Sequence, residues 1–182
     1  MRYFIAALVG MGLIILVIVL IFHGGGSNGV VKPVSLADYV NATSGVRLTI
    51  DGPVTASQTH YQAQITVTEN DANLSIIQGY EGTVIDSSSY PMNPSSYAVF
   101  LRALDKQGFT KGNPAKALAD ERGYCATGSR YIFELRDGEK QIDRFWSTSC
   151  GSGTYKGNAP TTRSLFEAQI PDFGTKANKV GL

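Results

Sequence analysis

The feature that most constrains this chain is an apolar run, Tyr3 to Phe22, in which no residue is charged. A helix needs roughly 20 predominantly apolar residues to cross the hydrocarbon core of a bilayer. A cleavable signal peptide is the competing interpretation, but its apolar region usually spans about 7–15 residues and ends at a small-x-small site. This run is longer and ends in Phe22-His23. The sequence therefore predicts an uncleaved transmembrane signal anchor over residues 1–23.

The orientation of this anchor follows from the few charges beside it. Arg2 and the α-amine precede the apolar run, and the next basic residue is Lys32. Because positive charge is retained on the cytoplasmic side, we expect a cytoplasmic N-terminus and an extracytoplasmic C-terminal domain. The two cysteines, Cys125 and Cys150, favour the same placement, since disulfides persist in oxidising compartments.

Charge balance limits the partners of the remainder of the chain. Residues 24–182 carry 15 basic and 15 acidic side chains, whereas nucleic-acid-binding domains are usually basic. We therefore expect no nucleic-acid partner, a membrane partner through residues 3–22, and an unidentified protein or cell-envelope partner. Asn41 and Asn73 begin glycosylation sequons, which have meaning only in a eukaryotic secretory pathway.

Composition divides the chain behind the anchor. Residues 24–45 are rich in glycine and serine and contain Pro33, which predicts a flexible tether. Residues 46–174 are predicted to form the extracytoplasmic domain, and residues 175–182 a C-terminal tail. Alternating apolar and polar residues predict four strands at the start of the domain, which fall at 46–52, 61–69, 74–80 and 82–90.

The hydrophobic period then changes to that of a helix. Apolar side chains recur at Tyr97, Phe100, Leu101 and Leu104, with Asn93 suited to the N-cap. A hairpin and a short last helix over 161–173, stopped by a proline, follow. The predicted fold is α+β: an N-terminal transmembrane helix, then an antiparallel sheet of about six strands with two helices packed on one face.

The hairpin carries its own register signal. Asp137-Gly138 is a strong turn sequence that favours a two-residue loop. In that register Phe133 faces Ile142. Counting along the strands also places Trp146 on the apolar face that contains Phe133.

The same register predicts a disulfide. Cys125 and Cys150 fall opposite each other if the two strands continue that far. Residues in a non-hydrogen-bonded antiparallel pair have Cα atoms about 4.5 Å apart, and a disulfide accepts roughly 4.4–6.8 Å. We therefore expect an intramolecular Cys125–Cys150 bridge with a structural role.

Catalytic and metal sites find little support in the sequence. Cys150 or Ser152 would need a base within hydrogen-bond reach, and the only histidines are His23 and His60. The stretch "GSGTYKG" lacks the order of a phosphate-binding loop, so its glycines are interpreted as turn residues. Two cysteines without clustered histidines do not make a zinc site. We expect no catalytic residue, no metal and no cofactor.

Three segments, "AVFLRALDKQGFTKG", "SRYIFELRDG" and "LFEAQIPDF", resemble those of a group of small bacterial single-pass membrane-anchored proteins of unknown function. The resemblance covers Val46 to Phe173 and implies an anchor followed by one extracytoplasmic domain. We expect a non-enzymatic, membrane-tethered module that binds a protein or an envelope component. One alternative is an envelope hydrolase with an unrecognised serine or cysteine site. Another is a pilin-like surface subunit, suggested by the apolar N-terminus and the disulfide loop.

Overall fold

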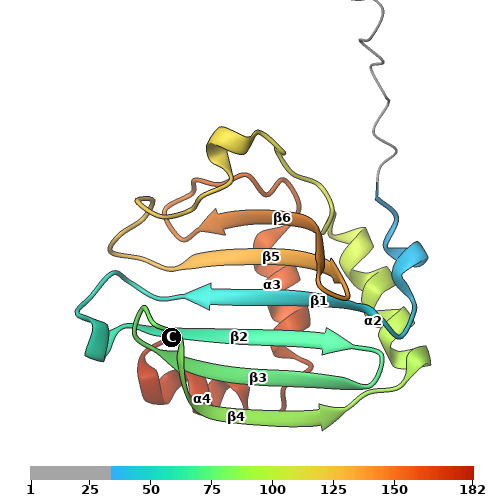
Figure 1. Cartoon of the computed structure of the whole chain (residues 1–182), viewed down its shortest axis with the longest axis horizontal. Helices are drawn as coiled ribbons and strands as arrows, with labels where there is room; N and C mark the ends of the chain where they lie inside the picture. Colours follow the sequence, from blue (N-terminus) through green and yellow to red (C-terminus); the bar gives the residue numbers. More distant parts are fainter. Residues whose placement is uncertain (1–33) are drawn as a thin grey trace, which may run out of the picture. The chain divides into compact units, whose positions relative to one another are not determined.

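The computed structural model describes residues 34–182, and an antiparallel sheet of six strands lies at its centre (Figure 1). The predicted anchor over 1–23 and the first part of the tether lie outside the described residues. No helix within residues 34–182 is long and apolar enough to span a bilayer. In chain order the elements are η1 (Leu36–Tyr39), β1 (Ser44–Asp51), η2 (Ser57–Thr59), β2 (Tyr61–Thr68), β3 (Asp71–Gln78), β4 (Thr83–Pro91), α2 (Pro94–Lys106), η3 (Lys116–Leu118), β5 (Arg130–Asp137), β6 (Lys140–Thr148), α3 (Ala159–Glu167) and α4 (Phe173–Val180).

The strands are arranged in the order β4-β3-β2-β1-β5-β6. The four strands predicted from alternation are confirmed as β1 to β4. Buried and less buried residues alternate along β1, β2 and β3, and β4 pairs with β3 at the edge of the sheet without a buried residue. Paired positions align these buried side chains in rows across the sheet. One row runs through Leu74, Ile65, Leu48, Phe133 and Phe145.

Helices cover one face of this sheet (Figure 1). The predicted α2 is confirmed, with Tyr97, Phe100, Leu101 and Leu104 all buried in the core. The side chain of Asn93 accepts a hydrogen bond from the amide of Ser96 at 2.9 Å, as an N-cap does. The α+β class is therefore as predicted, but the described chain has three α-helices rather than two.

The folded unit is longer at both ends than the predicted domain of residues 46–174. Leu36 of η1 is fully buried, although it falls within the predicted tether over 24–45. Residues 175–182, predicted as a tail, contain most of α4, whose Ala177 is buried. Gly181 follows α4 in the left-handed conformation with a φ of 75°, which favours glycine after a helix.

The hairpin register differs from the prediction by a shift in the turn. Asp137 pairs with Lys140, so Gly138 and Glu139 form the two-residue loop instead of Asp137-Gly138. Gly138 has a φ of 55°, so the positive φ falls on the first loop residue. A further register shift follows at Leu135, which the turn sequence alone does not reveal.

The observed register of the hairpin changes which aromatic side chain of β6 faces the helices. Phe133 pairs with Phe145, and both belong to the main core. Trp146, predicted on the same face as Phe133, lies on the opposite face. Its Nε1 donates to the carbonyl of Leu118 at 2.7 Å, and its ring packs against Tyr124 with centroids 4.8 Å apart. Trp146 therefore holds the 113–126 connection against the sheet.

Candidate functional site

The predicted disulfide is confirmed, but its two cysteines are not the paired strand residues that the predicted register made them. Cys125 and Cys150 are bonded, with Cα atoms 5.7 Å apart. Neither lies in a strand, because β5 begins after Cys125 and β6 ends before Cys150. The chain turns at Cys125, where the amide of Gly128 donates to its carbonyl at 3.1 Å. A Cβ at Gly128 would lie 2.7 Å from the Cys125 sulfur, so glycine lets the turn fold back onto Cys150.

His60 belongs to a buried charged cluster. Its Nε2 lies 3.0 Å from Oδ1 of Asp51, whose Oδ2 contacts Arg130 Nη2 at 2.7 Å. The side chains of His60 and Arg130 are 0% and 4% exposed. His60 Nδ1 lies 3.0 Å from the carbonyl of Pro53, and Tyr80 stacks on the ring. Burial raises the pKa of Asp51, against the opposite effects of Arg130 and His60.

These contacts keep the candidate catalytic residues apart. Both ring nitrogens of His60 have partners, and neither partner is a serine or a cysteine. Ser152 instead pairs with Thr148, whose hydroxyl lies 3.0 Å from the Ser152 hydroxyl. Cys150 is held in the disulfide. A general base must reach the proton that it abstracts, so His60 is placed to stabilise the fold rather than to activate Ser152.

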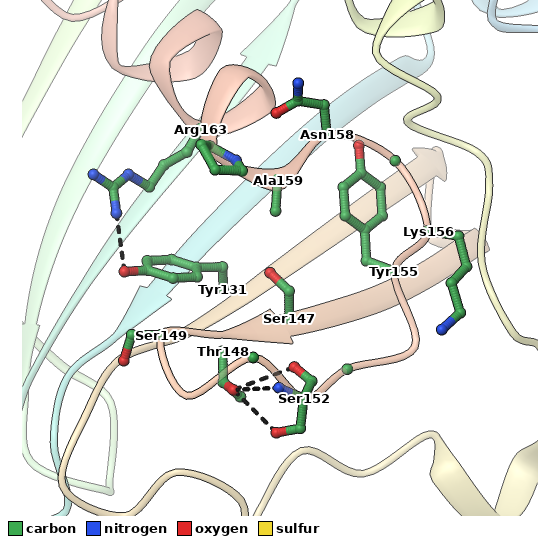
Figure 2. Close-up of a pocket in the computed structure, with 14 residues that line it drawn as sticks. Tyr131, Ser147, Thr148, Ser149, Ser152, Tyr155, Lys156, Asn158, Ala159 and Arg163 are labelled. Carbon is green, nitrogen blue, oxygen red and sulfur yellow. Dashed lines mark hydrogen bonds between the residues drawn. The ribbon is translucent and has the colours of Figure 1, made fainter.

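A pocket lies beside the disulfide, at the end of the β5–β6 hairpin. Its cavity measures about 550 Å³, within the range of small-molecule sites. Figure 2 shows side chains of β5, β6, the following loop and the first turn of α3 around one space. The lining residues are Tyr131, Ser147, Thr148, Ser149, Gly151, Ser152, Gly153, Tyr155, Lys156, Gly157, Asn158, Ala159, Pro160 and Arg163.

The glycines of the "CGSGTYKG" stretch form the wall of this pocket. Gly151 has a φ of 86°, and a Cβ at Gly153 would lie 2.4 Å from the carbonyl oxygen of Trp146. That carbonyl accepts hydrogen bonds of 2.9 Å from the amides of Thr154 and Tyr155. The loop therefore returns along the outer edge of β6, and glycine is required where the two backbones touch. The prediction that these glycines make a turn is confirmed.

The start of α3 forms the opposite side of the pocket. The side chain of Asn158 accepts a hydrogen bond from the amide of Thr161 at 3.1 Å and caps the helix. Pro160 suits the first turn, where an amide has no intrahelical acceptor. The positive end of the α3 dipole therefore faces the pocket.

Two basic residues line the pocket, and its lining contains no acidic one. Arg163 donates from Nη1 to the hydroxyl of Tyr131 at 2.9 Å, and its Nε lies 2.9 Å from Glu167. Glu167 is one helical turn further along α3 and outside the lining. Lys156 is exposed at the rim and makes no ion pair within the described part of the chain.

One polar atom in the lining lacks a partner. The hydroxyl of Ser147 is inaccessible to solvent and makes no hydrogen bond to any described residue. Figure 2 shows it directed into the space between the rings of Tyr131 and Tyr155. Buried hydroxyls are normally hydrogen-bonded, so the Ser147 hydroxyl is an unsatisfied polar group in the pocket lining.

Only part of this pocket could be identified from the sequence. Its glycine-rich stretch is predicted from sequence only as a turn, and Tyr131 and Arg163 join it only in the folded chain. Within residues 34–182 no group of three or more His, Cys, Asp or Glu side chains is arranged to hold a metal.

No protein family matches the sequence, and no curated protein matches it.

Proposed function

We propose that this chain is a membrane-tethered extracytoplasmic module that binds a protein or cell-envelope component through the pocket beside the Cys125–Cys150 disulfide. The pocket carries this proposal, because it is the size of a ligand site and is built from elements that the disulfide and the sheet hold in place. The resemblance to small bacterial membrane-anchored proteins supports the same cellular setting.

The disulfide and the apolar N-terminus support the location. Disulfides are typical of oxidising compartments, which lie outside the cytoplasm. A single-pass anchor over residues 3–22, with Arg2 on its cytoplasmic side, would keep the folded unit at the outer surface of that membrane. The intervening glycine-rich tether would give the pocket freedom to reach its partner.

Binding is favoured over hydrolysis by the contacts of the reactive groups. His60 is buried and engaged at both ring nitrogens. Ser152 has a threonine as its hydrogen-bond partner rather than a base. No observation gives comparable support to the pilin-like alternative.

Site-specific photo-crosslinking in the full-length, membrane-inserted chain tests the proposal. A benzophenone side chain at Ser152 places the reactive group in the pocket lining. The matched control carries it at Lys140, at the opposite, exposed end of the same hairpin. We expect a discrete crosslinked envelope component from position 152 only. The same products from both positions, or none from position 152, would contradict binding at the pocket.

A further inference from the structure

We infer that the pocket binds a small organic anion, with a carboxylate or phosphate group placed between Arg163, the hydroxyl of Ser147 and the first turn of α3. This inference rests on the proposed function and adds the chemical class of the ligand. Four independent observations support it: the charge of the lining, the helix end, the unpartnered hydroxyl and the apolar walls.

The charge of the lining is one-sided. Lys156 and Arg163 are the charged members of the lining, and both are basic. Arg163 is partly balanced by Glu167, whose carboxylate oxygen lies 2.9 Å from the Arg163 Nε without forming a hydrogen bond to it. Its Nη2 makes no hydrogen bond within residues 34–182, and a guanidinium presents its donors in a fork that matches an oxyanion. Lys156 at the rim adds a second, longer-range attraction.

The backbone contributes in the same direction. The amide of Ala159 at the start of α3 has no intrahelical acceptor, and the helix dipole gives this end a partial positive charge. These two features stabilise an anion at the start of α3, and no acidic side chain lines the pocket to oppose it. The Ser147 hydroxyl lies at the floor of the pocket without a partner among residues 34–182, and it can donate to the same anion once its side chain rotates toward the cavity.

The walls of the pocket indicate that the anion is part of a larger molecule. The rings of Tyr131 and Tyr155 flank the space in which the Ser147 hydroxyl lies (Figure 2). Tyr155 is held in place by a 2.8 Å hydrogen bond between its hydroxyl and that of Thr162. A cavity of about 550 Å³ exceeds the space that one oxyanion occupies. The structure thus favours an organic anion whose apolar part lies against the tyrosine rings.

Three probes with the same ring and different head groups test this inference: phenylacetate, phenyl phosphate and the neutral phenylacetamide. Saturation-transfer difference NMR on the full chain in detergent micelles would measure their binding. We expect one or both anions to bind at least about tenfold more tightly than the amide, as charge-assisted hydrogen bonds require. Their binding should weaken as salt is raised. The stronger anion distinguishes a carboxylate ligand from a phosphate ligand.

Charge variants locate the anion. Lys156→Gln removes an exposed charge and should weaken the anions by about threefold or more, whereas Lys140→Gln at the far end of the hairpin should not. Arg163→Gln should weaken them further and Arg163→Lys less. Glu167→Gln removes the carboxylate that competes for Arg163 and should strengthen them. Ser147→Ala should weaken the anions more than the amide, because a hydrogen bond to a charged acceptor is the stronger one.

The outcomes separate the two proposals. Equal binding of anion and amide, abolished by a bulky Ser147→Phe substitution, would overturn the anion and retain a ligand pocket. Anion binding that Arg163→Gln and Glu167→Gln leave unchanged would also overturn it. Failure of every probe, together with no crosslink from position 152, would overturn the pocket as a binding site altogether. Unchanged melting temperatures would show that each variant is folded.

Discussion

At the residue scale, the guanidinium of Arg130 is buried between the adjacent strands β1 and β5. Its side chain is 4% exposed, and Nη2 contacts both Asp51 Oδ2 at 2.7 Å and the carbonyl of Gly52 at 3.0 Å. Removing one partner of such a pair leaves the other charge buried without compensation. The same carboxylate also holds His60, so this one contact fixes the ends of two strands.

Arg130→Met should therefore lower the free energy of unfolding by about 3–5 kcal/mol. Denaturant titration of the folded unit would measure the loss. Arg136→Met is the matched control, because Arg136 is 27% exposed, lies 3.9 Å from Glu134, and leaves that carboxylate with Arg47 as a second partner at 3.8 Å. It should cost less than about 1 kcal/mol. A similar small loss for Arg130→Met would mean that Asp51 is adequately stabilised without it.

Asp120 provides a titration that tests the 113–126 connection. The Arg122 side chain donates to both carboxylate oxygens of Asp120, which lowers the pKa of that carboxyl to about 2. A depressed folded-state pKa means that the pair contributes above the unfolded value and is lost as pH falls through about 2. An NMR titration that follows the carboxyl carbon of Asp120 should therefore show this group still mostly ionised near pH 3.

Arg122→Gln should return the midpoint of Asp120 toward its ordinary value of 3.8. An unchanged midpoint in this variant would show that Arg122 does not hold the carboxylate in solution.

At the element scale, prediction succeeded where the signal was local. The strands β1 to β3 follow from alternation within each segment, and α2 follows from its apolar spacing and the Asn93 cap. It failed at α4, because the last helix was predicted to stop at Pro171 and residues 175–182 were predicted as a tail, although a new helix begins at Phe173. The register of the hairpin depended on a shift at Leu135 that no turn signal encodes.

The candidate site was predictable only in part for the same reason. The disulfide could be predicted from two cysteines and an oxidising compartment alone, so the prediction was correct although the strand register was wrong. The pocket required the loop to pack along β6 and α3 to fold back over Tyr131. Such contacts between distant segments are absent from any local pattern.

The disulfide ties together the two connections that flank the hairpin. Replacing both Cys125 and Cys150 by serine should lower the stability by roughly 2–5 kcal/mol, as for native bridges in small secreted domains. Calorimetric melting of the oxidised protein and the variant would measure it. Because Cys150 is two residues from Ser152, the pocket should also bind its ligand more weakly. Free thiols in non-reducing peptide maps would contradict the bridge.

At the scale of the whole molecule, the folded unit and the predicted anchor make separate demands on location. The disulfide needs an oxidising compartment, and the apolar run from Tyr3 to Phe22 is long enough to span a bilayer. The balanced charge of residues 24–182 gives the unit no general attraction to anionic lipid or nucleic acid. Its attachment to the membrane is therefore expected to depend on the apolar run alone.

Expressed in a bacterium, the full chain should stay in the membrane fraction through a carbonate wash. Met11→Lys combined with Ile14→Lys places two charges near the middle of the run, each costing about 2.5–3.5 kcal/mol at the centre of a membrane helix. This variant should leave the membrane fraction. Lys140→Glu together with Lys156→Glu, which alters charge only in the folded unit, should not change the fractionation. A soluble product of the unaltered chain that begins near residue 24 would show that the run is cleaved as a signal peptide. The disulfide would then form as before, since export alone supplies the oxidising compartment.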